Sequence, residues 1–209
     1  MKKILLLTDS LALPRDKPEA CRYEDTWPQL LKQSNYIIHQ ASVGGATSGD
    51  LLTQVTYHKM FEPDYVIVQS GIVDCAPRFM TRLELTLCRK YGYVGKAIIK
   101  LMSNNMIRRL RRITYTSKKS FSKNIDSIRQ RFNTTPVFFI GIIPPHPLYE
   151  KVLPGVTKKI REYNSILKTK ENYISVDDFD LSGTMSDHHH LNSYGHKQIY
   201  QRIINRLDA

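Results

Sequence analysis

The apolar run at residues 4–7, which ends in Thr8-Asp9-Ser10, most constrains what this chain can fold into. A short, continuous apolar run followed by a polar turn is typical of a buried parallel strand. On open α/β sheets, ligands and reacting groups lie just past the carboxyl ends of such strands. Ser10 is therefore placed where a nucleophile could stand, although a serine after a strand more often only caps the following helix.

A second polar cluster, Asp187-His188-His189-His190, lies near the other end of the chain. An Asp three residues before a His suits a local pair, in which the carboxylate accepts the ring N–H and the other ring nitrogen takes a proton from a serine. The alternative is a metal-binding tract. Three adjacent histidines cannot all turn to one centre, and no Cys or Glu cluster accompanies them, so we expect neither a metal nor another cofactor.

Strand patterns and helix patterns alternate along the chain. The predicted strands cover residues 3–7, 36–41, 65–70, 136–143 and 173–176, and the predicted helices include 27–32, 50–61, 158–168 and 192–207. This alternation favours a flavodoxin-like, three-layer α/β/α sandwich with a five-stranded parallel sheet. A length of 209 residues fits one domain, spanning 1–209.

The connection between Asp74 and the fourth strand is about sixty residues long, where a short crossover would suffice. We therefore expect a basic helical insert over about residues 79–132. No Asp or Glu occurs from Leu85 to Ile125. The same stretch carries these basic residues: Arg89, Lys90, Lys96, Lys100, Arg108, Arg109, Arg111, Arg112, Lys118, Lys119 and Lys123. Apolar residues from Ile99 to Ile113 recur at steps of three and four, which predicts an amphipathic helix.

The formal net charge of +12 indicates an acidic partner: nucleic acid, membrane phospholipid or a phosphorylated substrate. An amphipathic helix with basic and apolar faces suits an anionic membrane surface, which we expect residues 96–119 to contact. The alternative is a core-packed helix with a solvated basic face, although such faces usually mix both signs of charge. Nucleic acid is less favoured, because Tyr91, Tyr93 and Tyr115 do not follow an RNA-binding spacing.

The three cysteines, Cys21, Cys75 and Cys88, are scattered and odd in number, so we expect free thiols and a cytoplasmic protein. A buried, inert Cys75 is favoured over a nucleophilic one. We expect no signal peptide, because the apolar start is short, and we expect no membrane helix, because no apolar stretch reaches the ~20 residues that it needs. The expected location is the cytoplasm, with peripheral contact at the inner membrane face.

Four blocks, in this order, resemble the motifs of the SGNH, or GDSL-like, hydrolases. They are Thr8-Asp9-Ser10, the glycine block at residues 41–47, Gly71-Ile72-Val73-Asp74, and Asp187-x-x-His190 followed by Leu-Asn. The resemblance covers nearly the whole chain and implies a Ser10 nucleophile, a His190 base and an orienting Asp187. It also implies that the backbone N–H groups of Ser10 and Gly45 hold the oxyanion.

The resemblance implies a serine-dependent ester hydrolase or acyltransferase that acts through an acyl-enzyme. We expect an acylated carbohydrate, or a lipid-linked or phosphorylated sugar, as acyl donor or acceptor, with Asp9, Asp74 and Arg78 contacting the substrate. The stretch from Gly71 to Arg78 further resembles proteins of bacterial polysaccharide biosynthesis. A non-catalytic binding protein derived from this family, or a basic nucleic-acid- or polyanion-binding protein, is the alternative.

Two positions depart from the family pattern. Thr8 stands where the family has the first Gly of its nucleophile block, and Val73 stands where it has an Asn. In the family, that Asn side chain donates a hydrogen bond to the oxyanion, and Val cannot donate. Loss of one such donor typically costs about 100- to 1,000-fold in turnover. We therefore expect slow reaction with small generic esters unless Gln69 or Arg78 supplies the donor.

Overall fold

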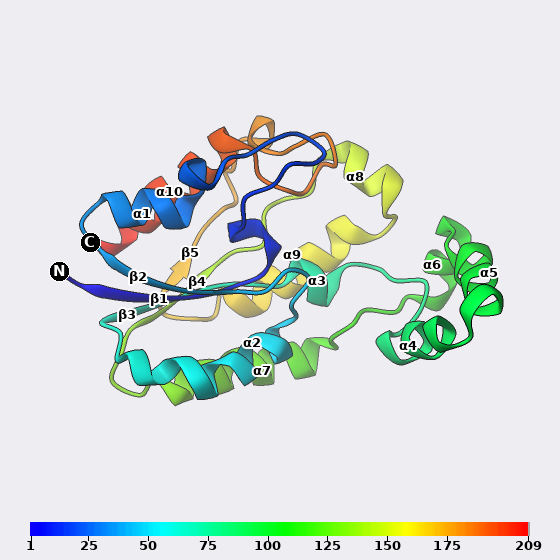
Figure 1. Ribbon diagram of the computed structural model, residues 1–209, viewed down its shortest axis with the longest axis horizontal. Helices are drawn as coiled ribbons and strands as arrows, with labels where there is room; N and C mark the ends of the chain where they lie inside the picture. The colour runs from blue at the N-terminus through cyan, green and yellow to red at the C-terminus, as the bar shows by residue number, and fades with distance from the viewer. Residues whose placement is uncertain (209) are drawn as a thin grey trace.

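A five-stranded, all-parallel sheet with helices on both faces forms the body of the protein, as a computed structural model of residues 1–208 shows (Figure 1). Its strand order is β2-β1-β3-β4-β5. The strands are β1 (Lys3–Thr8), β2 (Ile37–Ser42), β3 (Tyr65–Gln69), β4 (Val137–Ile140) and β5 (Tyr173–Ile174). The expected three-layer sandwich with five parallel strands is confirmed.

β1 is an interior strand of the sheet, which agrees with its apolar residues on both sides. Residues 4–7 are fully buried, and β1 pairs with β2 on one side and with β3 on the other. Thr8, the last residue of β1, is in register with Ser42 of β2 and Gln69 of β3. The carboxyl ends of three neighbouring strands therefore meet at one edge of the sheet, where functional groups collect in this type of fold.

The helices form the two outer layers. α1 (Trp27–Gln33) packs against α10 (Ser193–Leu207) on one face of the sheet. On the other face, α7 (Lys118–Arg131) packs against both α2 (Ser48–His58) and α9 (Val156–Leu167). Right-handed crossovers between parallel strands lead to this distribution. Two short helices, α3 (Ile72–Cys75) and α8 (Pro147–Val152), lie near the carboxyl ends of the strands (Figure 1).

The helices expected as one insert over 79–132 divide into two groups. α4 (Arg82–Lys90), α5 (Gly92–Met102) and α6 (Asn105–Arg111) project from the body (Figure 1). A backbone bridge closes the neck of this projection, where the Arg78 N–H donates to the Ile113 carbonyl at 2.8 Å. α7, by contrast, buries Phe121, Ile125 and Ile128 and covers the sheet. We therefore use the name insert only for α4–α6.

The prediction of a single amphipathic helix between Ile99 and Ile113 is wrong, because two helices cover this stretch. α5 ends at Met102, and α6 starts after Asn104, whose side chain accepts a hydrogen bond from the Ile107 N–H at 2.9 Å. An Asn at this position caps a new helix and ends the apolar periodicity of the old one. Within residues 1–208, we find no helix with both the length and the hydrophobicity that crossing a membrane requires.

Candidate active site

Ser10 lies directly after β1, at the edge of the sheet where the strands end. Ser10 is the first residue of a short 3-10 turn, Ser10–Ala12. Asp9 caps this turn, because its Oδ1 accepts a hydrogen bond from the Leu11 N–H at 3.0 Å. This side-chain cap stops the strand and turns the chain sharply. Leu11 and Ala12 are buried, whereas Ser10 remains partly exposed.

His190 and Asp187 approach Ser10 from the opposite end of the sequence. Ser10 Oγ lies 3.3 Å from His190 Nε2, and His190 Nδ1 lies 2.5 Å from Asp187 Oδ2. Asp187 Oδ1 also accepts the backbone N–H of His190 at 3.0 Å, so the carboxylate holds both ring and backbone. When Nδ1 carries the proton, Nε2 is free to accept one from the serine.

The charges of this pair suit proton transfer. Burial would by itself raise the pKa of the Asp187 carboxyl, but hydrogen bonds from the His190 backbone and ring bring that pKa down to about 2. Burial lowers the pKa of the His190 imidazole to about 4; His189 adds to this effect, whereas Asp187 opposes it. At neutral pH, the imidazole is therefore uncharged beside an ionised carboxylate, which is the state a general base needs.

The two preceding histidines have other neighbours. The ring of His189 stacks on Tyr149 of α8 at 5.0 Å, and the ring of His188 stacks on His146 at 4.8 Å. Asp187, His189 and His190 bring potential metal-ligand atoms within 4.8 Å of one another. The 2.5 Å separation within the Asp187–His190 pair is shorter than the roughly 3 Å between two ligands of one zinc ion. These residues therefore fit a hydrogen-bonded pair better than a metal site.

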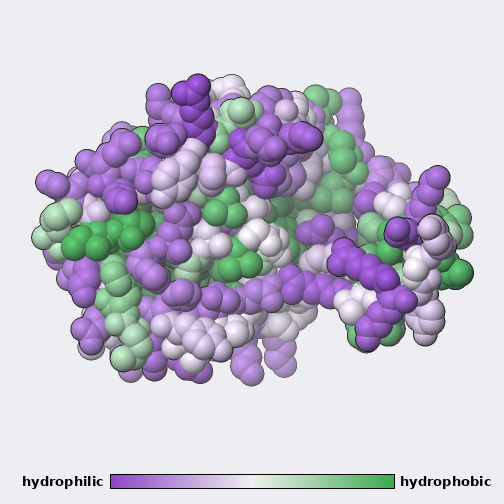
Figure 2. All heavy atoms as spheres, viewed as in Figure 1, coloured by the Kyte–Doolittle hydropathy of each residue, from purple (hydrophilic) through white to green (hydrophobic). Residues whose placement is uncertain are grey.

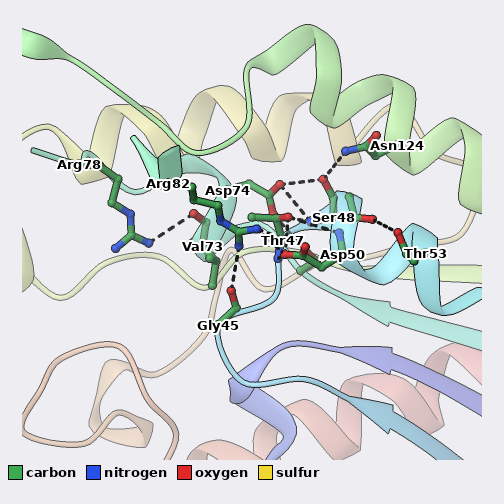
Figure 3. Close-up of polar contacts among 12 residues, drawn as sticks. Gly45, Thr47, Ser48, Asp50, Thr53, Val73, Asp74, Arg78, Arg82 and Asn124 are labelled. Carbon is green, nitrogen blue, oxygen red and sulfur yellow. Dashed lines mark hydrogen bonds and ion pairs between the residues drawn. The ribbon is translucent and has the colours of Figure 1, made fainter. Parts of the chain in front are cut away.

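Gly45 lies in the turn after β2, with a positive φ of 71° that favours glycine. Within residues 1–208, no hydrogen bond occupies the backbone N–H of Ser10 or of Gly45. The carbonyl of Gly45 accepts a hydrogen bond from Arg82 Nη2 at 3.3 Å, and Arg82 also forms an ion pair with Asp50 at 2.9 Å (Figure 3). Through Arg82, the insert therefore holds the turn that contains Gly45 in place.

Asp74 anchors the same turn from inside. Its carboxylate accepts the backbone N–H of Ser48 at 3.0 and 3.1 Å, the Ser48 hydroxyl at 2.7 Å and the Ser70 hydroxyl at 3.2 Å (Figure 3). The side chain of Asn124 on α7 reaches the same Ser48 hydroxyl at 3.0 Å. This network ties the start of α2 to the end of β3. It fixes Gly45 relative to the strand edge through the buried side chains of Asp74, Ser48 and Ser70.

Asp9 and Asp74, which we expected to contact the substrate, are both fully buried. Asp9 caps the Ser10 turn, and burial raises the pKa of its carboxyl to about 7. The Asp74 carboxylate accepts hydrogen bonds from the Ser48 and Ser70 hydroxyls. Both aspartates act through the backbone that they position, which the motif pattern alone does not reveal.

Val73, in α3, is partly buried and packs against the core. Arg78 Nη2 donates to the Val73 carbonyl at 3.3 Å (Figure 3). The Arg78 guanidinium stacks over the Tyr115 ring at 4.5 Å. Gln69 is buried, and its Oε1 accepts the indole N–H of Trp27 at 3.1 Å. Of the two candidate replacement donors, only the partly exposed Arg78 lies beside Val73 in an accessible position.

Several residues around the site carry no motif. Contacts between segments far apart in the sequence bring further residues to the site, and no local pattern in a single sequence reveals them. These residues are Arg82, Ser48, Asn124 and Tyr149. One local signal did exist for the first of them. Thr81-x-x-Glu84 is a capping box that starts α4 and so sets the position of Arg82. Cys75 is buried, and burial raises the pKa of its thiol far above the usual range, which agrees with an inert cysteine.

Comparison with known proteins places this geometry in context. The model of the GDSL-like lipase/acylhydrolase family matches residues 9–198. The fold is similar to that of a lipase/acylhydrolase from Enterococcus faecalis, with 15% identity, 99% of this chain and 95% of the other covered, and a TM-score of 0.64. It is also similar to the psychrotrophic esterase EstA from Pseudoalteromonas sp., with 16% identity, coverage of 100% and 97%, and a TM-score of 0.61. No curated protein matches the chain.

Proposed function

Because the chain belongs to the GDSL-like lipase/acylhydrolase family, we propose that it cleaves acyl esters through an acyl-enzyme formed on Ser10. The single observation that carries this proposal is the relay of three side chains from opposite ends of the sequence. Its separations are 3.3 Å from Ser10 Oγ to His190 Nε2 and 2.5 Å from His190 Nδ1 to Asp187 Oδ2. Nucleophile, base and orienting acid in hydrogen-bond order define this class of site.

The reaction starts when Ser10 Oγ attacks the ester carbonyl and its proton moves to His190 Nε2. The resulting oxyanion accepts hydrogen bonds from the backbone N–H groups of Ser10 and Gly45. Collapse of this intermediate breaks the bond to the leaving alkoxide, which takes the proton from His190. Water, activated by the same imidazole, then attacks the acyl-enzyme and releases the acid and free Ser10. If a sugar hydroxyl replaces the water, the same residues complete acyl transfer.

A carbohydrate ester with a phosphorylated or lipid-linked sugar is the substrate class we propose. The formal net charge of +12 supports an anionic partner, and Arg78 beside Val73 offers a cationic contact at the edge of the site. Surface-polysaccharide assembly in bacteria is a setting in which such sugar esters are made and removed. A non-catalytic binding role is the competing proposal, and the observation in its favour is Val73 at the position of the family's oxyanion Asn.

The surface of the insert supports a second proposal, that the protein acts at a membrane surface. It exposes large apolar side chains at its outer end, beside basic residues (Figure 2). The most exposed of these apolar residues are Leu83, Tyr91, Tyr93, Val94, Leu101, Met106 and Leu110. Contiguous exposed apolar surface beside cations suits the headgroup region of an anionic bilayer. We propose that α4–α6 dock there and hold the active site near a lipid-linked substrate.

Covalent labelling of Ser10 tests the catalytic proposal. A structure of the Pseudoalteromonas esterase carries monoethylphosphonate as inhibitor, which motivates a fluorophosphonate probe. We expect Ser10 Oγ to displace fluoride and gain the phosphonyl mass, detected on the Ser10 peptide by mass spectrometry. Ser10→Ala should remain unlabelled, whereas Ser186→Ala, at an exposed loop serine, should label like the wild type. A folded wild-type protein without the mass shift would favour the non-catalytic alternative.

A further inference from the structure

A second site lies between the insert and the body of the protein. A cleft of about 560 Å³ separates the end of α6 from α8 and the start of α9. Five cationic side chains line it: Arg108, Arg109, Arg112, Lys158 and Lys159. Two glutamates, Glu150 and Glu162, also line it. The arginines come from the insert and the lysines from α9, so the fold brings together charges that lie far apart in the sequence.

The two glutamates already accept hydrogen bonds or form ion pairs outside the insert, and only the charge of Arg109 also acts on Glu150. Glu150 accepts the backbone N–H groups of Gly155 and Thr157 at 2.6 and 2.8 Å, and so caps the start of α9. Glu162 pairs with Lys159 at 3.1 Å and with Lys118 at 3.7 Å. Within residues 1–208, no carboxylate lies within 4.0 Å of a side-chain nitrogen of Arg109, Arg112 or Lys158. The cleft therefore retains unpaired positive charge from both of its walls.

Arg108 carries its charge in a partly buried position. Its guanidinium lies over the Phe79 ring at 5.3 Å and donates one hydrogen bond to Asn105 Oδ1 at 2.8 Å. Burial and the nearby charge of Arg78 both lower the pKa of Arg108. Cations that repel one another across a cleft raise the free energy of the unliganded protein, and a bound anion removes that cost. A solvated basic surface without a ligand would instead spread such charges apart.

α8 lies beside both the cleft and the candidate active site, because its Glu150 lines the cleft and its Tyr149 contacts a histidine next to His190. The ring of Tyr149 stacks on His189, which adjoins His190 with a centroid separation of 3.8 Å. Burial raises the pKa of the Tyr149 hydroxyl to about 12, and the charges of Arg78, Arg108 and Asp187 also act on it. α8 therefore borders both the charged cleft, through Glu150, and the Ser10 relay, through Tyr149.

We propose that this cleft binds the phosphate or diphosphate group of the substrate whose acyl ester reaches Ser10. This inference rests on the proposed ester chemistry and specifies its substrate class. Guanidinium groups bind phosphate oxygens in a bidentate manner, and a multiply charged group matches several unpaired cations better than a single carboxylate does. The cations carry this site; the start of α9 does not, because Glu150 already occupies its N–H groups.

Binding of inorganic pyrophosphate tests the cleft directly. We would measure its Kd by isothermal titration calorimetry with wild-type protein and with the triple variant Arg109→Gln, Arg112→Gln, Lys158→Gln. A matched control, Arg89→Gln, Lys90→Gln, Lys100→Gln, removes the same number of charges from exposed positions of the insert outside the cleft. We expect at least about tenfold weaker binding for the cleft variant, since each charged hydrogen bond contributes that much, and little change for the control.

Two further arms separate the explanations. Ser10→Ala should bind pyrophosphate like the wild type, so failure of the ester chemistry and failure of the phosphate site give different results. Vesicles of phosphatidylcholine with phosphatidylglycerol test whether the cleft cations serve a lipid surface instead. Absence of pyrophosphate binding to the wild type, or equal losses in cleft and control variants, would overturn the proposal. Vesicle binding that depends on the cleft cations without any pyrophosphate binding would also overturn it.

Discussion

His190, three residues after Asp187, differs from its two histidine neighbours in the partners of its ring. Only His190 has one ring nitrogen on Asp187 and the other toward Ser10. We expect His190→Ala to lower kcat for a nitrophenyl acetate as far as Ser10→Ala does, because nucleophile and base act as a unit. His188→Ala, which removes a ring stacked on His146, should retain activity within a few-fold. Loss of activity only in the His188 variant would show that another histidine is the base.

By the motif resemblance, Val73 takes the position of the family's oxyanion Asn, which leaves the proposed oxyanion hole with two backbone donors and no side-chain donor from this block. Arg78 Nη2 is engaged with the Val73 carbonyl in the unliganded protein. We expect Val73→Asn to raise kcat for small generic esters, by at most the roughly 100- to 1,000-fold expected for one donor. Circular dichroism would check that the variant is folded. A folded variant without any gain would indicate that another group already fills the oxyanion hole.

At the scale of elements, the insert combines exposed apolar residues with cations that no acid between Leu85 and Ile125 balances. We expect the wild type to bind phosphatidylcholine vesicles that contain phosphatidylglycerol. Tyr93→Ser, Leu101→Ser and Leu110→Ser together should weaken this binding at least tenfold, because these side chains are 90%, 76% and 82% exposed and would lose their burial in the bilayer. Co-sedimentation with vesicles at low and high salt would measure the effect.

A matched control comes from the body of the protein. Tyr57→Ser, Met60→Ser and Val152→Ser remove exposed apolar side chains outside the insert. This control should leave vesicle binding unchanged, and salt should weaken binding of the wild type, because each Lys or Arg near the surface contributes about 1 kcal/mol that ions screen. Equal effects of both triple variants would argue against a membrane role of the insert.

At the scale of the whole molecule, buried titratable groups couple folding to pH. His196 is buried, and its Nδ1 accepts the Trp27 N–H at 3.3 Å. Burial lowers its pKa to about 4, with Asp25 opposing the effect, whereas an unfolded chain binds the proton near pH 6.5. The stability that His196 contributes at neutral pH is therefore lost as the pH falls from about 6.5 to about 4. A shift of this size corresponds to about 3 kcal/mol.

Urea unfolding at pH 7 and at pH 4 measures this coupling. We expect the difference in unfolding free energy between wild type and His196→Gln to shift by about 3 kcal/mol against the wild type on acidification. Asp9 gives the opposite sign, because its pKa is raised to about 7 and the folded state holds a proton that the unfolded chain releases. The wild type should therefore gain relative to Asp9→Asn over the same range. Parallel pH profiles for all three proteins would contradict both assignments.

Local patterns were enough to predict the sheet and the order of the site residues along it. The buried run before Thr8 and the strand-helix alternation carry that information, because strand and helix periodicities reflect burial on one or two faces. The same applies to the Asp187-x-x-His190 spacing, since two residues three apart can pair without help from the rest of the chain. The Asn104 cap that divides α5 from α6 was also present in the sequence, but the apolar spacing that runs across it masked the break.

Only the tertiary structure decided which polar groups are buried and which charges meet. Asp9 and Asp74 look like site residues in the sequence, yet packing of the layers removes both from solvent. The basic α7 looks like part of the insert, yet its apolar stripe covers the sheet. Arg109 and Lys158 lie far apart in the sequence, yet both line one cleft. Burial and electrostatics depend on distance in space, and a single sequence specifies that distance only between near neighbours along the chain.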